Sequence, residues 1–248
     1  MASSVTACLI IIGNEILSGR THDKNLPHIG HELNEVGIRL LEVRVIPDIE
    51  QTIIDTVNEC REKFTYIFTT GGIGPTHDDI TTASIAKAFG KKVIRHPEAE
   101  ERLLAHYKAE DVNEARMKMA DIPEDAELID NPVSAAPGFR LENVYVMAGV
   151  PRIMQAMLDY IKPTLTGGKP MLSAALELSA PEGDVADKIT QVQESFTDVE
   201  IGVYPLIKHD KLMSNIVFRC EDSDRLMDSV DAIKKHLNAL DIGYVGVA

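Results

Sequence analysis

The residues best suited to chemistry lie in one stretch, Thr69 to Thr81, which reads TTGGIGPTHDDIT. Its three glycines leave the backbone bare, so a ligand can approach the amide groups closely. Two adjacent carboxylates, Asp78 and Asp79, stand where a phosphate-binding loop would place its phosphate, and no Gly-Lys-Ser/Thr follows them. Carboxylates repel a bare phosphate, but Mg²⁺ binds carboxylates and phosphate oxygens together. The stretch therefore predicts a Mg²⁺-type site for a phosphorylated ligand.

A structural interpretation of the same residues is a tight turn that leads into a helix with an acidic start, which complements the helix dipole. Thr76 and Asp79 have the spacing of a capping box, and Pro75 would fix the direction in which the chain enters the helix. Glycine spacing alone does not separate a turn from a ligand site.

Regular elements are predicted on both sides of the glycines. The β-branched and aromatic run from Tyr66 to Thr70 predicts a buried strand. Ile80 to Phe89 predicts a helix with Ala83 and Ala86 on its inward face. The glycines thus occupy a strand-to-helix turn, which is where α/β proteins commonly bind anions.

Strand and helix patterns alternate along the first two thirds of the chain. The continuous apolar run from Val5 to Ile12 predicts a central strand covered on both faces, and Leu40 to Val45 predicts another strand. Helical periodicity fills the intervals, beginning with Leu26 to Val36. Such alternation predicts an α/β fold, a three-layer sandwich around a mostly parallel sheet.

A second polar loop, Gly13 to Asn25, follows the first predicted strand. Ligands of parallel sheets bind beyond the carboxyl ends of the strands, where this loop and the glycine turn both lie. We therefore expect Glu15, Asp23 and Asn25 to face the same crevice as the acidic pair. The alternative for Asp23 or Asn25 is to cap the helix that begins at Leu26.

The stretch from Pro163 to Pro170 contains two glycines and predicts a linker. It divides the chain into domains of residues 1–166 and 170–248. The second domain shows the order strand, helix, strand, strand, helix, which predicts a small α+β unit of the ferredoxin-like or KH-like type. A KH clamp for RNA needs a Gly-x-x-Gly loop with basic flanks, and neither is present. We interpret the unit as a packing or oligomerisation module.

Composition narrows the possible partners and the compartment. The 39 acidic and 25 basic residues give a net charge of −14, which argues against binding to nucleic acid or to an anionic membrane surface. The three cysteines are far apart, with no Cys-x-x-Cys pair, and no apolar run approaches the length of a membrane span. No basic residue precedes Arg20, so the start lacks the charge of a signal peptide. We expect a reduced, cytoplasmic protein.

Two motifs resemble those of a known family. The string from Thr70 to Thr81 resembles the signature of the molybdopterin-binding-like domain shared by MoaB, Mog and the N-terminal part of the competence-damage protein CinA. The loop from Gly13 to Asn25 resembles the CinA-type N-terminal motif, and the second domain resembles the small domain that follows in CinA. The further C-terminal amidohydrolase domain of CinA is not expected here.

The resemblance implies a set of site residues. Asp78, Asp79, Glu15 and Asp23 would be catalytic, with the first two also holding the metal. The other residues expected to bind the ligand or its phosphate are Gly13, Asn25, Thr70, Gly71, Gly72, Gly74, Pro75, Thr76, Thr81, Ser134, Pro137, Gly138 and Gly149.

The second half of the chain departs from the family pattern at several polar positions. Family members carry Lys-Gln-Ala-x-x-Pro where Lys118 is followed here by methionine. Ser134 replaces a glycine and Ala135 a threonine in the next loop, and Ala148 and Ile153 replace a proline and a glutamate. These changes bear on the identity of the substrate and on turnover.

The function that the resemblance implies is metal-assisted cleavage of a nucleotide pyrophosphate such as ADP-ribose or FAD. The expected cofactor is a divalent metal, Mg²⁺ or Co²⁺, with K⁺ as a further candidate, and no organic prosthetic group is expected. Adenylyl transfer to molybdopterin and non-catalytic binding of a nucleotide or pterin are the alternatives. The expected partner is a small nucleotide or molybdopterin-like ligand, and relatives suggest a homo-oligomer, either a dimer or a trimer.

Overall fold

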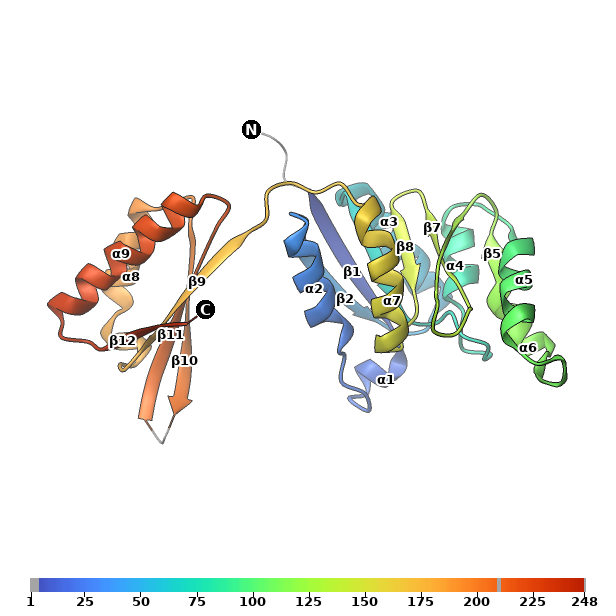
Figure 1. The fold of residues 1–248 in the computed structure, drawn as a ribbon, viewed down its shortest axis with the longest axis horizontal. Helices are drawn as coiled ribbons and strands as arrows, with labels where there is room; N and C mark the ends of the chain where they lie inside the picture. The colour runs from blue at the N-terminus through green and yellow to red at the C-terminus, as the bar shows by residue number, and fades with distance from the viewer. Residues whose placement is uncertain (1–4, 209–210, 248) are drawn as a thin grey trace. The chain divides into compact units, whose positions relative to one another are not determined.

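The computed structural model describes residues 5–208 and 211–247 and divides into two units, Met1–Gly168 and Lys169–Ala248 (Figure 1). Residues 1–4, on which the expectation about the start of the chain partly depends, lie outside the described part. Among the described residues, every helix is too short or too polar to cross a bilayer.

The first unit is built on a sheet of six strands in the order β2-β1-β3-β8-β7-β6. The first four strands in this order are parallel, and β7 and β6 are antiparallel to their neighbours. The predicted fold class, an α/β sandwich around a mostly parallel sheet, is thus confirmed. The strands are β1 Thr6–Ile12, β2 Arg39–Ile46, β3 Tyr66–Thr70, β6 Glu127–Ile129, β7 Gly138–Leu141 and β8 Val144–Met147.

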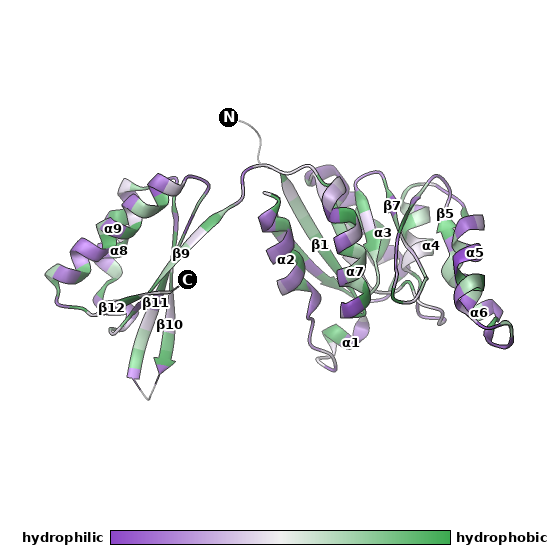
Figure 2. Ribbon diagram, in the orientation of Figure 1, coloured by the Kyte–Doolittle hydropathy of each residue, from purple (hydrophilic) through white to green (hydrophobic). Residues whose placement is uncertain are grey.

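Helices cover both faces of this sheet, because the side chains of the central strand β1 alternate between two cores. Cys8, Ile10 and Ile12 join the core beneath α3, α4 and α5, and the residues between them join the core beneath α2 and α7. Figure 2 shows hydrophobic residues along the strands and on the sides of the helices that face them. These helices are α2 Asn25–Glu35, α3 Glu50–Lys63, α4 Thr81–Ala88, α5 Pro97–His106 and α7 Pro151–Ile161.

Short elements connect these layers at the end of the unit that contains α5. The antiparallel ribbon of β4 (Val93–Arg95) and β5 (Asp121–Pro123) packs beside α4, and α6 (Glu114–Met117) runs into a 3₁₀ turn at Lys118–Ala120. A single helical turn, α1 (Asn14–Leu17), follows β1. The ribbon and the 3₁₀ turn place Lys118 and Asp121 next to the start of α4.

Helix α4 begins one residue later than predicted, and Ala83 is the one member of its predicted inward face that is exposed. It starts at Thr81, with Ile80 as its N-cap and no side-chain cap bond, so Thr76 and Asp79 do not cap it. Thr81 and Ser84 are fully buried, whereas Ala83, which was expected to face inward, is exposed. Thr81 turns inward because its hydroxyl donates to the carbonyl of Gly71.

The second unit is an antiparallel sheet in the order β10-β11-β9-β12 with two helices. Its strand–helix–strand–strand–helix–strand sequence is the ferredoxin-like one of the two predicted types. The last strand was not predicted, because only four residues at the end of the chain form it. The elements are β9 Leu172–Leu178, α8 Ala186–Ser195, β10 Glu200–Lys208, β11 Lys211–Cys220, α9 Ser223–Ala239 and β12 Tyr244–Val247.

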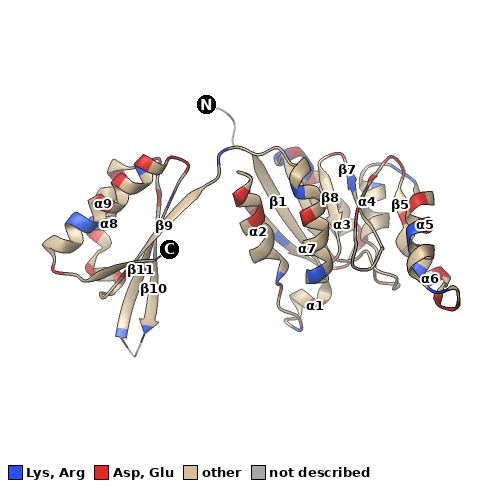
Figure 3. Ribbon diagram, viewed as in Figure 1, with Lys and Arg blue, Asp and Glu red and all other residues tan. Residues whose placement is uncertain are grey.

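Charges of both signs are interspersed over the helices, as Figure 3 shows for α5, α7 and α9. One pair in the second unit has ideal fork geometry: Arg225 Nε and Nη2 donate to the two carboxylate oxygens of Asp198 at 2.8 and 2.7 Å. The Arg225 guanidinium lowers the pKa of Asp198 to about 2.

We expect this pair to titrate in a defined pH window. Because the folded-state pKa of Asp198 lies below its value of about 3.9 in an unfolded chain, its contribution to stability is present above pH 4 and is lost as the pH falls toward 2. In Arg225→Met, carbon-detected NMR should show the Asp198 pKa rising toward about 3.9. An Asp198 pKa that stayed the same in this variant would mean that the Arg225 guanidinium does not cause the lowered pKa.

Candidate functional site

The glycine turn lies where the carboxyl ends of β1, β3 and β8 meet. The amide of Gly71 donates to Met147 O at 3.2 Å, and a β-carbon on Gly71 would lie only 2.1 Å from Ile12 O. Gly71 also has a φ of +106°, which only glycine adopts readily. Close approach of three strand ends therefore requires glycine here, whether or not a ligand binds.

Thr81 holds the turn closed from the start of α4. Its hydroxyl donates to Gly71 O at 3.0 Å and its amide donates to Gly72 O at 3.0 Å. Gly72 has a φ of +67°, and a β-carbon on it would lie 2.2 Å from Thr81 Oγ1. Thr81 was predicted to bind the ligand; its side chain is fully buried and its hydroxyl is used inside the turn.

Three successive amides of the turn remain free to bind an anion. In the described part of the chain, the N–H groups of Gly72, Ile73 and Gly74 donate to no protein acceptor. The amide of Gly71, which was also predicted to bind phosphate, donates to Met147 O instead of being free. Consecutive free amides in a turn are a recurrent means of binding anions.

The acidic pair converges on one hydroxyl group. Thr76 Oγ1 lies 2.5 Å from Asp78 Oδ1 and 2.6 Å from Asp79 Oδ2, and the Thr76 amide donates to the same Asp79 oxygen at 2.8 Å. The hydrogen bond from the Thr76 hydroxyl, followed by the Asp78 amide, lowers the pKa of the Asp78 carboxyl, so Asp78 is ionised at neutral pH. Two carboxylates and a hydroxyl thus share one exposed loop.

This arrangement suits a cation. A hydroxyl carries one hydrogen and cannot donate to both carboxylates, so one of the two short oxygen–oxygen contacts lacks a proton. A divalent cation coordinated by these hard oxygens would relieve that repulsion, and the exposed loop leaves room for the water molecules that Mg²⁺ retains. The residues present therefore fit a Mg²⁺-type ion.

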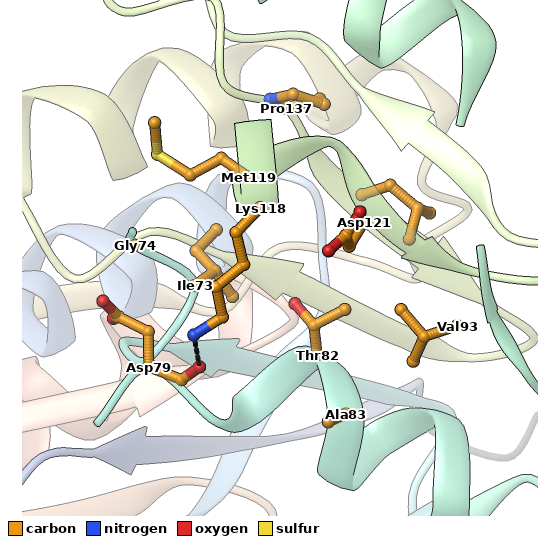
Figure 4. A pocket seen from close by; sticks show the side chains of 11 residues that line it. Ile73, Gly74, Asp79, Thr82, Ala83, Val93, Lys118, Met119, Asp121 and Pro137 are labelled. Carbon is orange, nitrogen blue, oxygen red and sulfur yellow. Dashed lines mark hydrogen bonds between the residues drawn. The ribbon is translucent and has the colours of Figure 1, made fainter. Parts of the chain in front are cut away.

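Lys118 fastens the acidic loop from outside. Its Nζ donates to Thr76 O at 2.6 Å and to Asp79 O at 2.9 Å. Figure 4 shows the second of these bonds. Sequence reasoning missed this residue, although Lys118 begins a segment that resembles a family motif. This chain lacks the glutamine of that motif but retains its lysine, and the retained lysine was the available signal.

We expect Lys118→Met to loosen the loop without unfolding the unit. Loss of hydrogen bonds from a charged donor costs about 1.5 kcal/mol or more, so hydrogen exchange of the Thr76 and Asp79 amides should become about tenfold faster. Lys87→Met is the matched control, because it removes only the exposed ion pair between Lys87 on α4 and Glu50 on α3. It should leave the exchange rates of both amides unchanged. Equal exchange rates of these amides in Lys118→Met and Lys87→Met would contradict the role of Lys118 in holding the loop.

The predicted site residues divide between two hollows. A cavity of about 170 Å³ lies between the glycine turn, α4 and the β4–β5 ribbon, and a smaller one of about 60 Å³ lies beside the loop after β1. The predicted residues that line the larger cavity are Gly74, Asp79 and Pro137. Those that line the smaller cavity are Glu15, Asp23, Asn25, Thr70 and Gly149.

The smaller hollow is built around Asn25. Its Nδ2 donates to Gly149 O at 2.8 Å, which joins α2 to the end of β8, and the Asp23 carboxylate accepts from the Leu26 amide at 2.7 Å. Asp23 thus performs the capping role that was the alternative. Within the described residues, the buried Asn25 Oδ1 and Thr70 Oγ1 have no hydrogen-bond partner. Both are therefore suited to a polar ligand group.

Several residues that were predicted to bind the ligand line neither hollow. Gly138 lies inside β7, where a β-carbon would come within 2.4 Å of Val146 O, so strand packing requires the glycine. Ser134 Oγ accepts from Asn131 Nδ2 at 2.7 Å and lines neither hollow. Gly13 is buried at the end of β1, and a β-carbon there would lie 2.6 Å from the Glu15 carboxylate. Pro75 is exposed on the acidic loop.

A further carboxylate, Asp48, lies at the same edge of the sheet and was missed. It follows the end of β2 and accepts a hydrogen bond from the Asn14 amide at 2.9 Å. Its position just after a predicted strand that pairs with β1 was the available signal. The edge thus carries acidic groups after three neighbouring strands.

Two family models together match nearly the whole chain. The probable molybdopterin-binding domain matches residues 8–167, and the middle domain of FAD synthase matches residues 170–245. The second match covers the small α+β unit of the predicted second domain.

Individual relatives agree with these matches. A protein from Archaeoglobus fulgidus is 34% identical over 230 residues, covering 93% of this chain and 97% of the relative. A CinA-like protein from Desulfosudis oleivorans is 30% identical, covering 89% of this chain and 56% of the relative. A probable FAD synthase from Caenorhabditis elegans is 29% identical, covering 96% of this chain and 51% of the relative. The chain spans about half the length of these last two.

The fold of the first unit also matches a solved structure. The protein CinA from Thermoplasma acidophilum aligns with a TM-score of 0.61 and 32% identity, over 65% of this chain and 98% of that protein. The similarity expected from the two loop motifs is confirmed.

Proposed function

Since this chain belongs to the family of probable molybdopterin-binding domains and is CinA-like, we propose that it cleaves the pyrophosphate bond of a nucleotide such as ADP-ribose or FAD with the help of a divalent cation. The observation that carries the proposal is the loop in which Asp78 and Asp79 converge on one hydroxyl beside three free amides. The relatives named as probable FAD synthase and CinA-like support a nucleotide ligand.

Asp78 and Asp79 would hold the cation, which we propose to be Mg²⁺ or Co²⁺, with K⁺ as an accessory ion. When bound, such a cation neutralises phosphate charge and makes a coordinated water more acidic. The free amides from Gly72 to Gly74 bind the phosphate oxygens on which charge develops, and Lys118 keeps the loop in place.

The reaction is a hydrolysis in which the oxygen of water bonds to phosphorus and the bridging P–O bond breaks. ADP-ribose gives AMP and ribose 5-phosphate, and FAD gives AMP and FMN. We assign the acceptance of the water proton to Glu15, whose carboxylate is exposed at the smaller hollow, and this role requires that the ligand extend along the sheet edge from the acidic loop to that hollow. Asp23 has one oxygen committed to the Leu26 amide and orients the loop.

Two alternatives each have an observation in their favour. Adenylyl transfer to molybdopterin is favoured by the family match itself. Binding without turnover is favoured by Ile153 and Ala148, which occupy positions of polar or rigid residues in the family pattern and pack here against the core beneath α7.

The test incubates the purified chain with ADP-ribose, with FAD, and with molybdopterin plus ATP, each with Mg²⁺, with Co²⁺ and with EDTA. Release of AMP from ADP-ribose or FAD that EDTA abolishes is the expected result. Adenylylated pterin would establish the transferase alternative. Binding of these ligands without any product would establish the non-catalytic one.

We also propose that the protein is cytoplasmic and forms a homo-oligomer, either a dimer or a trimer. Cys8, Cys60 and Cys220 are free thiols, as suits a reducing compartment. The ferredoxin-like unit is our candidate for the subunit contact. Light scattering of the full chain and of residues 1–168 gives the masses that test this: an oligomer that survives removal of the second unit would assign the contact to the first.

A further inference from the structure

We propose that Cys8 and Cys60 are a modification site: a thiol pair that hydrogen peroxide converts into a reversible disulfide bond. Cys8 lies in the central strand β1 and Cys60 near the end of α3, and both belong to the core beneath α3, α4 and α5. Neither cysteine lines either hollow, so the proposal is independent of the proposed hydrolysis. The bond would tie together the two ends of a segment that contains the Gly13–Asn25 loop.

The two thiols are in contact in the reduced protein. Cys8 Sγ donates a hydrogen bond to Cys60 Sγ at 3.6 Å, and both side chains are fully buried. The sulfurs of a disulfide bond are about 2.05 Å apart, so these two would have to approach by about 1.5 Å. Cys220 belongs to the second unit, where its thiol donates to Asp198 O. Cys8 and Cys60 are therefore the pair that is placed to form a bond within the first unit.

The hydrogen bond gives the two thiols different reactivities. The proton that Cys8 donates, together with the charge of the Arg44 guanidinium, lowers the pKa of Cys60. The same hydrogen bond raises the pKa of Cys8. The thiolate is the form of cysteine that attacks an electrophile. Cys60 is therefore the nucleophile of the pair, and Cys8 keeps its proton for the second step.

The edge of the sheet gives a small oxidant a path to the pair. β2 is the edge strand beside β1, and the pairing of the two strands is irregular at Cys8, where the register skips Leu41. Glu42 lies opposite Cys8 in this register, and Arg44 Nε donates to Glu42 at 2.6 Å while its Nη atoms donate to Glu59 on α3. Partly exposed ion pairs of this kind contribute little to stability. The cover over the thiols on this side can therefore open without unfolding the unit.

The reaction balances with hydrogen peroxide as the oxidant. The Cys60 sulfur bonds to one peroxide oxygen and the O–O bond breaks, so the other oxygen leaves as hydroxide, takes up the proton lost by Cys60, and becomes water. The Cys8 sulfur then bonds to the Cys60 sulfur, the S–O bond breaks, and the hydroxyl group leaves as water with the Cys8 proton. The thiols lose two electrons and two protons, and the peroxide becomes two molecules of water. A dithiol reductant reverses the bond by thiol–disulfide exchange.

The experiment treats the full-length protein with hydrogen peroxide, removes the peroxide with catalase, and then blocks free thiols with iodoacetamide in denaturant. Mass spectrometry should show that the wild type falls from three free thiols to one, with the Cys8 peptide linked to the Cys60 peptide. Cys220→Ala is the matched control and should form the same link. The link should be absent from Cys8→Ala and Cys60→Ala.

Thermal unfolding of the same samples tests whether the folded unit accommodates the bond. The oxidised wild type should melt at least about 4 °C above the reduced protein, because a disulfide bond restricts the unfolded chain. Dithiothreitol should return the midpoint to its reduced value, and Cys60→Ala should show no shift of this kind.

Three outcomes would overturn the proposal. They are three free thiols after the treatment, a Cys60 that is oxidised to sulfinic acid without a link to Cys8, and a melting temperature that oxidation leaves unchanged or lowers. The result is separate from that of the hydrolysis assay, because the thiol count requires no nucleotide and no metal.

Discussion

Asp79→Asn will reduce AMP release from ADP-ribose at least about 100-fold. The substitution preserves the size of the side chain but replaces a carboxylate oxygen that lies 2.6 Å from Thr76 Oγ1 and faces Asp78. A metal site that loses one of two carboxylates loses both affinity for the cation and stabilisation of charge on the phosphate. Steady-state kcat/KM at saturating Mg²⁺ is the measurement.

The control for this prediction is Asp187→Asn, which removes a fully exposed carboxylate from α8 in the other unit. It should retain wild-type activity. Because Asp79 also accepts the Thr76 amide, circular dichroism must show that the variant is folded. A folded Asp79→Asn protein with more than a tenth of wild-type kcat/KM would rule out the acidic pair as the cation site.

Gly71→Ala will destabilise the first unit by about 3–5 kcal/mol. A β-carbon at this position would lie 2.1 Å from Ile12 O, in the backbone of the central strand, and the φ of +106° adds strain. Strained backbone and overpacking each cost about 1–3 kcal/mol, and a backbone carbonyl in a central strand has little freedom to move away. Urea unfolding followed by circular dichroism measures the loss.

Gly90→Ala separates the two contributions. Gly90 also has a positive φ, +64°, but a β-carbon on it would meet nothing within 4 Å. It should therefore cost only about 1 kcal/mol, which is the conformational part. If the two variants were equally stable, the close approach of β3 to β1 at this turn would not be a steric constraint.

The regular elements of this protein were predictable because their sequence patterns are strong and local. Tyr66–Thr70 and Leu172–Leu178 are strands with the expected bounds, since runs of β-branched and aromatic or apolar residues have few alternatives. The burial of Thr81 on α4 was not predictable from periodicity. It is set by the bond from Thr81 to Gly71 O, which depends on the tertiary position of the turn.

The loops that form the candidate site were predictable from the sequence, but the way their side chains group into two hollows was not. Both loops do lie at the carboxyl edge of the sheet, as strand order dictates. Their division into two hollows depends on Asn25, whose bond to Gly149 O spans 124 residues of sequence. The Lys118 clamp likewise joins segments 42 and 39 residues apart, and a sequence pattern carries no information about such distances.

The double attachment of Lys118 has a thermodynamic consequence. One ammonium group restrains the carboxylate loop and also borders the larger cavity, so a ligand in that cavity that accepts the remaining ammonium proton would stiffen the loop. Coupling of this kind is reciprocal. Whatever factor a cation on the loop adds to the affinity for a ligand in the cavity, that ligand must add to the affinity for the cation, and loss of the lysine should uncouple the two.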